Sequence, residues 1–162
     1  LKDITLINCA VSKIDNLLVN FEEKDFDKII DTNIKGNFLL TKSLLPIMIE
    51  NNWGRIIHIS SIAGYLGAVG TIPYGLSKTS LIGMSRGLAK EYAKFNITSN
   101  ILDLGYFETG LFNKLKDEIK KQLLSQIPSK KLGNIKNIVN CINFLIKSEY
   151  VNGAKINIDG GI

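Results

Sequence analysis

The run Gly54-Arg55-Ile56-Ile57-His58-Ile59 is a short apolar segment rich in β-branched residues, and a long segment of helical periodicity lies on either side of it. Apolar side chains recur at three- and four-residue spacings from Phe21 to Asn51 and again from Thr71 to Phe95. A buried strand between two amphipathic helices is the repeating unit of a parallel sheet with helical crossovers. These residues therefore predict an α/β fold.

Further runs extend this pattern at both ends. The remaining predicted elements are strands over Ile4–Asn8, Ile97–Leu102 and Ala154–Ile158 and a helix over Ile135–Lys147. Asn33, Gly36 and Pro46 are expected to bend or split the first long helix, and Asn96 is expected to end the second. The order β-α-β-α-β-α-β predicts a Rossmann-like, doubly wound sheet of four parallel strands with its ligand site at their carboxyl ends.

The composition is that of a globular domain, with 162 residues of which 45% are hydrophobic and 22% charged. No apolar run approaches the roughly 18 residues of a membrane span. The two cysteines, Cys9 and Cys141, form no cluster with histidine, so no metal site is predicted. We expect both to be buried thiols in a cytoplasmic protein.

Most of the positive charge lies in one segment. Residues 113–136 hold seven lysines against two acidic residues, an excess equal to the net charge of +5 of the whole chain. A solvated lysine-rich helix explains this segment, and attraction of an anionic substrate is the alternative. A basic nucleic-acid-binding module is not expected, because the segment has no aromatic residue on which bases could stack.

The chemistry is expected after the strand at residues 54–59. Ser61 follows that strand, Tyr74 stands thirteen residues later, and Lys78 comes four residues after Tyr74. Residues four apart share one face of a helix, so the phenol and the ammonium should point into one site. A nearby ammonium favours the phenolate by up to about 4 kcal/mol, which predicts a lowered pKa for Tyr74.

A phenol, a hydroxyl and an ammonium together suit proton transfer to a carbonyl oxygen. Tyr74 would give or take the proton while Ser61 hydrogen-bonds the same oxygen. A tyrosine and a lysine four residues apart also occur by chance on many helices. The preceding strand and the serine at the right spacing favour the catalytic interpretation. His58 lies away from any GxSxG motif, which argues for an ordinary strand histidine and against a serine hydrolase.

An ordered set of motifs resembles the short-chain dehydrogenase/reductase family of NAD(P)-dependent oxidoreductases. The matching segments are Leu6-Ile7-Asn8-Cys9-Ala10 (the family's NNAG), Thr32-Asn33-Ile34-Lys35-Gly36, Ile59-Ser60-Ser61-Ile62-Ala63-Gly64, Tyr74-Gly75-Leu76-Ser77-Lys78 (YxxxK), Gly105-Tyr106-Phe107-Glu108-Thr109 (PGxIxT), and Asn152-Gly153 with Asp159-Gly160-Gly161. The resemblance runs along the whole chain, from the fourth strand of the family's seven-stranded fold to its last.

The resemblance implies a catalytic role for four residues. Asn33 would position a water of the proton relay, Ser61 would bind the substrate carbonyl, and Tyr74 would be the acid/base. Lys78 would bind the nicotinamide ribose and polarise Tyr74. From the residues alone, Asn33 is equally explained as a polar residue that bends a helix.

The resemblance also implies contacts to NAD or NADP. Tyr74 and Lys78 would meet the nicotinamide ribose. Gly105, Phe107 and Thr109 would meet the nicotinamide end, with Gly105 allowing close approach of the backbone. Asn8 and Ala10 would lie beside the adenosine, although Asn8 is also explained as a strand-end cap.

Some positions depart from the family pattern. Cys9, Val11 and Leu104 stand where the family usually has asparagine, glycine and proline, and the family's TGxxxGxG turn for the pyrophosphate does not occur in the sequence. Residues 1–162 are therefore expected to be the carboxyl-terminal part of a single Rossmann domain. The alternative is a fragment or pseudoenzyme that binds no dinucleotide.

The substrate is expected to be a small carbonyl or alcohol compound. Loops over residues 65–72 and 106–115 would line its pocket. The resemblance favours a 3-oxoacyl thioester, with a sugar-derived compound as the rival. The two long helices resemble those through which family members form homodimers and homotetramers.

Overall fold

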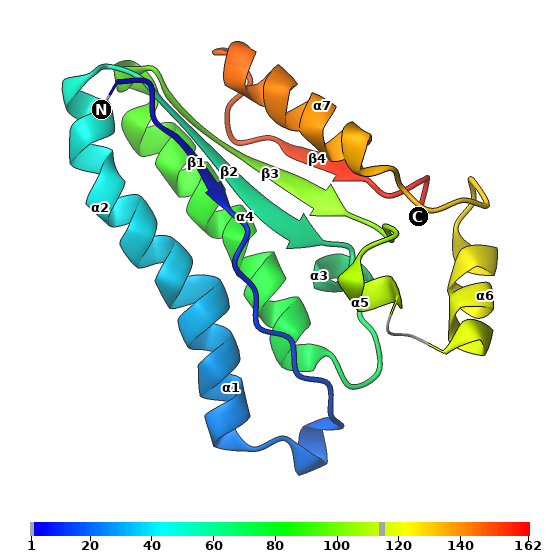
Figure 1. The fold of residues 1–162 in the computed structure, drawn as a ribbon. Helices are drawn as coiled ribbons and strands as arrows, with labels where there is room; N and C mark the ends of the chain where they lie inside the picture. The colour runs from blue at the N-terminus through cyan, green and yellow to red at the C-terminus, as the bar shows by residue number, and fades with distance from the viewer. Residues whose placement is uncertain (1, 114–115) are drawn as a thin grey trace.

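The computed structural model describes residues 2–113 and 116–162, and it shows a parallel sheet with helices on both faces (Figure 1). Its strands, in spatial order, are β1 (Thr5–Asn8), β2 (Gly54–Ser61), β3 (Ile97–Leu104) and β4 (Lys155–Ile158), and all neighbours pair in parallel. The predicted α/β class and the four predicted strands are confirmed. Residues 114 and 115, which end the second predicted substrate loop, lie outside the described part.

Helices α2 (Asn37–Glu50) and α4 (Ile72–Tyr92) cover one face of the sheet, and α7 (Ile135–Lys147) covers the other, as Figure 1 shows. Consecutive strand residues alternate between the two faces. Ile56 packs with Met48 on the α2 and α4 side, whereas Ile57 packs with Leu145 under α7. Burial of each such side chain contributes about 2 kcal/mol, so both helical layers are held to the sheet.

The first long predicted helix is split, as expected. A helix α1 (Glu23–Ile30) passes into a π-helical turn η2 (Asp31–Gly36) and then into α2. The turn contains Asn33, which is fully buried. Pro46 lies inside α2, which continues past it to Glu50. The interruption is therefore at Asn33, where a π-helical turn frequently marks a functional site.

The second long helix ends where the sequence predicts. A 3₁₀ turn η3 (Ala93–Phe95) follows α4, and Asn96 takes the left-handed conformation with φ of 53°. Asparagine tolerates this conformation better than most residues. The chain then enters β3 directly.

Four short elements were not predicted. They are the 3₁₀ turn η1 (Leu18–Asn20) and the helices α3 (Ala63–Leu66), α5 (Gly110–Asn113) and α6 (Asp117–Gln126). Helix α6 lies in the lysine-rich segment and has no buried residue, which agrees with the solvated-helix interpretation of that segment.

The cysteine prediction is wrong in one respect. Cys9 is exposed, because it follows β1 at the edge of the sheet, while Cys141 is half-buried. None of the helices in the described ranges is long and apolar enough to cross a membrane. Within those same ranges, no three His, Cys, Asp or Glu side chains gather in a group that could hold a metal ion.

Candidate active site

Ser61, Tyr74 and Lys78 meet at the carboxyl end of β2. Ser61 is the last residue of that strand, and Pro73 in the first turn of α4 places Tyr74 just inside the helix. The Ser61 hydroxyl is hydrogen-bonded to the Tyr74 phenol. The Lys78 Nζ lies 5.7 Å from the centroid of the Tyr74 ring. The structure thus brings together the three side chains that the spacing predicted.

Two hydrogen bonds lock α4 against β2 at this point. The Lys78 ammonium donates to the Ile59 carbonyl at 2.8 Å, and the Ser60 hydroxyl donates to the Lys78 carbonyl at 3.3 Å. Tyr74 and Lys78 are only 8% and 4% exposed. The phenol and the ammonium are therefore held in a largely dehydrated position, where the ammonium charge acts strongly on its neighbours.

Asn33 belongs to the same site, but its side-chain amide is already hydrogen-bonded to Ser12 and Ser77. Its Oδ1 accepts from the Ser12 backbone N–H at 2.7 Å, and its Nδ2 donates to the Ser12 carbonyl at 2.9 Å. The Nδ2 also donates to the Ser77 hydroxyl at 2.9 Å, which in turn donates to the Tyr74 carbonyl at 2.7 Å. Asn33 thus ties the segment after β1 to the first turn of α4. The predicted water contact of Asn33 stays a prediction.

The pKa of Tyr74 is raised, whereas the sequence argument predicted a lowered one. Burial is the largest cause; the hydrogen bond from Ser61 opposes it, and the negative charges of Asp15 and Asp103 add to the rise. The prediction considered the Lys78 charge and left out the cost of burying a phenolate. A raised pKa keeps Tyr74 a neutral phenol at neutral pH, which suits a proton donor.

Burial acts on Lys78 in the opposite direction to its acidic neighbours. It lowers the pKa of Lys78 to about 8, and the charges of Cys9 and Asp103 raise it. Lys78 is then mostly an ammonium at pH 7. Such a cation stabilises the phenolate that Tyr74 becomes after it gives up its proton.

A second ammonium lies near Tyr74. Lys13 comes from the segment after β1, and its Nζ is 5.8 Å from the Tyr74 ring centroid. Its partner is the carboxylate of Asp15, with which it forms an ion pair. Lys13 was not predicted as part of the site, because the segment after β1 has no regular periodicity.

The residues predicted to contact the nicotinamide end lie after β3. The hydrogen of Gly105 faces Asp159, whose Cα would be 2.7 Å from an added Cβ. Glycine at this position therefore allows β3 and β4 to end close together, which differs from the ligand contact that was predicted. Phe107 is buried, whereas Thr109 is exposed.

Phe107 packs against Gly133, and this contact supports a prediction. A Cβ on Gly133 would lie 2.4 Å from the Phe107 Cε1, and the Phe107 ring is only 6% exposed. Gly133→Ala is expected to displace the ring and to lower the free energy of unfolding by about 1–3 kcal/mol. Urea denaturation measures the change.

Gly83→Ala is the matched control for that substitution. Gly83 lies within α4, and an added Cβ there meets nothing within 4 Å. Alanine favours the helix by about 0.8–1 kcal/mol over glycine, so this variant should gain stability. An equal effect of the two substitutions would contradict the close packing of Phe107 on Gly133.

The two residues predicted to lie beside the adenosine differ in their solvent exposure. Ala10 is exposed, whereas Asn8 is buried. The Asn8 Nδ2 donates to the Thr41 hydroxyl at 3.4 Å and lies 3.1 Å from the His58 Nδ1. Its Oδ1 is buried and has no hydrogen-bond partner in the described part of the chain. Asn8 is therefore mainly part of a buried polar network beneath the sheet edge.

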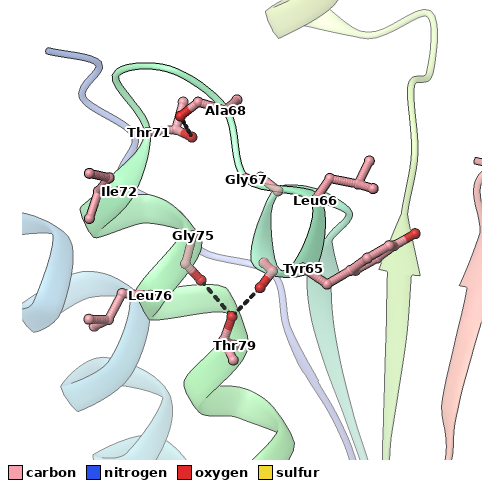
Figure 2. A pocket seen from close by; sticks show the side chains of 11 residues that line it. Tyr65, Leu66, Gly67, Ala68, Thr71, Ile72, Gly75, Leu76 and Thr79 are labelled. Carbon is pink, nitrogen blue, oxygen red and sulfur yellow. Dashed lines mark hydrogen bonds between the residues drawn. The ribbon is translucent and has the colours of Figure 1, made fainter. Parts of the chain in front are cut away.

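The first predicted substrate loop lines a cavity of about 380 Å³ between α3 and the start of α4 (Figure 2). The walls include Tyr65, Leu66, Ile72 and Leu76. Ser61, Tyr74 and Lys78 are not among its lining residues. Gly75, the residue after Tyr74, is among the lining residues, so the loop lies next to the predicted catalytic residues.

Besides Lys13, two features of the site were not predicted from the sequence. Ser77 lies within the YxxxK motif and connects Asn33 to Tyr74. Asp103 and Lys155 form an ion pair on neighbouring strands, with 2.8 Å between Nζ and Oδ2. A charged residue within the apolar run Ile101-Leu102-Asp103-Leu104 was the available signal for this pair.

Comparison with known proteins places this geometry in context. Residues 2–162 match the model of the family described as enoyl-(acyl carrier protein) reductase. The 3-oxoacyl-(acyl-carrier-protein) reductase of Buchnera aphidicola is 40% identical over 97% of this chain and 65% of its own length. The enzyme of the same name from Rickettsia bellii is 37% identical over 99% of this chain and 67% of its own length. The chain thus spans about two thirds of the length of these curated relatives.

A solved structure shows the same fold. The gluconate 5-dehydrogenase of Burkholderia cenocepacia, in complex with NADP and tartrate, superposes with a TM-score of 0.92 at 28% identity. The match covers 97% of this chain and 63% of that protein. The four strands and their helices therefore form the arrangement found in that dehydrogenase.

Proposed function

The chain belongs to the short-chain dehydrogenase/reductase family, and we propose that the whole protein transfers hydride between NAD or NADP and a carbonyl or alcohol substrate. The observation that carries this proposal is the meeting of Ser61, Tyr74 and Lys78 at the carboxyl end of β2. Parallel sheets place their ligands at this end. Each of the three groups has a distinct task in carbonyl reduction.

Tyr74 is the proton donor of the proposed reaction. Its phenol is neutral at neutral pH because burial raises its pKa, and it donates its proton to the substrate oxygen as negative charge develops there. The Ser61 hydroxyl donates a hydrogen bond to the same oxygen. Lys78 stabilises the phenolate left on Tyr74. In alcohol oxidation the same groups act in reverse.

The residues at this end fit a nicotinamide cofactor. The Lys78 ammonium has three N–H donors, and in the described residues its acceptor is the Ile59 carbonyl. It therefore retains donors for the hydroxyls of a ribose. Tyr74 lies on the same face, where it could contact the ribose as well. A nicotinamide bound there supplies or accepts the hydride.

Two substrate classes are supported. A 3-oxoacyl thioester is the first candidate, because the curated relatives at 37% and 40% identity are named 3-oxoacyl-(acyl-carrier-protein) reductases. A sugar-derived hydroxy acid is the second, because the superposed solved structure is a gluconate 5-dehydrogenase. In both reactions a single carbonyl is exchanged with a secondary alcohol, which the same catalytic groups can serve.

Hydride turnover by the whole protein tests the proposed function. Acetoacetyl thioester reduction with NADPH and NADH should be compared with gluconate oxidation with NADP and NAD. We expect turnover in one of these four reactions to exceed that in the others by at least about tenfold. Absence of turnover with every cofactor and substrate pair, in a protein shown to be folded, would overturn the proposal.

We also propose that the protein is a cytoplasmic homodimer or homotetramer. Five large apolar side chains on α2 and α4 are about half exposed. They are those of Phe38, Leu39, Leu40, Ile72 and Leu76. Pairing these helices with those of a second copy would bury these side chains in a four-helix interface. Sedimentation equilibrium of the whole protein measures the number of copies.

A further inference from the structure

A carboxylate is buried on the face of the sheet that α4 covers, close to the proposed catalytic residues. Asp103 is the next-to-last residue of β3, and it pairs in register with Ser60 on β2. Its side chain is only 3% exposed. One of its oxygens, Oδ1, has no partner among the residues described. A buried carboxylate with an unused oxygen is costly, so this position needs an explanation.

Lys155 holds the other oxygen of Asp103. Its Nζ donates to Oδ2 at 2.8 Å and also lies 4.3 Å from the centroid of the Tyr65 ring. The Tyr65 hydroxyl donates to the Asp159 Oδ2 at 3.2 Å, and in Figure 2 this ring points away from Thr79. The Lys155 ammonium is therefore fixed between a carboxylate and an aromatic face. Asp103 is held in place by a partner that is itself fixed.

Asp103 lies next to β2, the strand to which Lys78 is hydrogen-bonded. The Lys78 ammonium donates to Ile59, and Ser60, the neighbour of Asp103 in the sheet, donates to the Lys78 carbonyl. A negative charge that is shielded from water acts strongly on a nearby buried ammonium. The Asp103 charge accordingly raises the pKa of both Lys78 and Tyr74.

Building on the proposed function, we propose that Asp103 is a positioning residue of the reaction: its carboxylate, fixed by Lys155, keeps the Lys78 ammonium charged beside Tyr74. Burial alone disfavours a charged lysine, and Lys78 must carry its charge to stabilise the phenolate. Asp103 supplies the compensating negative charge from the face of the sheet that α4 covers. It does so without contacting the substrate side of Tyr74.

Other titratable groups face the same site from the elements packed around it. Cys9 and the Lys13–Asp15 pair come from the segment after β1, and His58 comes from β2. The Asp15 side chain is 51% exposed, so dissolved salt screens its charge. Asp103 is the buried carboxylate of this set. Its effect should therefore persist at high salt.

Titration of Lys78 in the whole protein tests this inference without turnover. The ¹³Cε resonance of Lys78, assigned by its loss in Lys78→Arg, reports protonation of the ammonium. Its midpoint, expected near pH 8, should fall by roughly 0.5–1 pH unit in Asp103→Asn, and it should do so at both low and high salt. Asp15→Asn is the matched control and should leave the midpoint unchanged. An unchanged midpoint in Asp103→Asn would overturn the inference.

The pH dependence of carbonyl reduction provides the functional arm. At high salt, which screens the exposed Asp15, the alkaline limb of the rate profile should move to lower pH in Asp103→Asn and should stay in place in Asp15→Asn. If the Lys78 titration midpoint falls in Asp103→Asn while the alkaline limb of the rate profile does not move, Asp103 has no part in the reaction. That result would overturn the inference. If no variant turns over, the proposed function fails, and the Lys78 midpoint alone decides whether Asp103 supports the ammonium.

A second variant covers the case in which Asp103→Asn does not fold. The double variant Asp103→Asn, Lys155→Gln removes both charges and leaves no unpaired ammonium beside Tyr65. Neutral replacement of a buried ion pair is often tolerated. The Lys78 midpoint should fall in this variant as well, and a midpoint equal to that of the unmodified protein would contradict the proposal.

Discussion

Tyr74→Phe is expected to slow carbonyl reduction by the whole protein about 10³-fold while leaving the fold intact. The substitution removes the proton donor and the hydrogen bond that Tyr74 shares with Ser61. It keeps the ring, which fills a position that is 8% exposed. The expected loss in stability is that of one hydrogen bond, about 1 kcal/mol. Single-turnover oxidation of the reduced nicotinamide measures the rate, and urea denaturation measures the stability.

Tyr92→Phe is the control for this experiment. Tyr92 is the last residue of the same helix and packs against the core beneath α2 and α4. Its hydroxyl is far along the helix from the site, so its loss should leave the rate within about twofold. A Tyr74→Phe enzyme with full activity, or one whose rate falls only as much as that of Tyr92→Phe, would remove Tyr74 from the proton transfer.

The proximity of Ser61, Tyr74 and Lys78 could be predicted from sequence because its geometry is local. Tyr74 and Lys78 are four residues apart on one helix, and Ser61 ends the strand that precedes that helix. Helical geometry places residues at this spacing on one face whatever surrounds them. The parallel direction of the strands needed no further information, since strands joined by helical crossovers run parallel. Both features therefore depend on short-range rules.

The electrostatics of the site could not be predicted in the same way. The sequence indicates that Lys78 is close to Tyr74, but burial of the phenol depends on how α4 packs on β2 and β3. Burial dominates the pKa of Tyr74 and reverses its predicted direction. Long-range packing also decides that Asp103 meets Lys155, 52 residues away. Neither effect is encoded in a local spacing.

The contacts of His58 could not be predicted from the sequence either. The sequence indicates a strand histidine, and the structure shows where its two nitrogens point. The Asn8 Nδ2 can only donate, so the His58 Nδ1 at 3.1 Å must accept. The proton of the neutral ring is then on Nε2, which faces the Ser99 hydroxyl at 3.3 Å, and Ser99 donates onward to Ser85 at 3.1 Å. The partners come from β1, β3 and α4, and only the sheet register unites them.

Acidification from pH 7 to pH 4 is expected to lower the free energy of unfolding by about 3 kcal/mol through His58 alone. Burial, and after it the Lys78 charge, lowers the pKa of His58 from 6.5 to about 4. Above pH 6.5 the imidazole is neutral in both the folded and the unfolded chain, so it adds no pH dependence. Between the two values the unfolded chain binds a proton that the folded chain excludes. The free energy of unfolding therefore decreases as the pH is lowered, and most of this decrease is reached by pH 4.

His58→Gln isolates this contribution from those of the other acidic and basic groups. The variant is expected to be less stable at pH 7, because it loses part of the buried network. Its stability should fall less steeply toward pH 4, so its deficit relative to the unmodified protein should shrink by about 3 kcal/mol. Urea denaturation at four pH values between 7 and 4 measures both proteins. His58 is the single histidine of the sequence, so its ¹⁵N resonances identify the Nε2–H tautomer directly. A deficit that is constant with pH, or an imidazole that titrates near pH 6.5, would show that the ring can be protonated in the folded sheet.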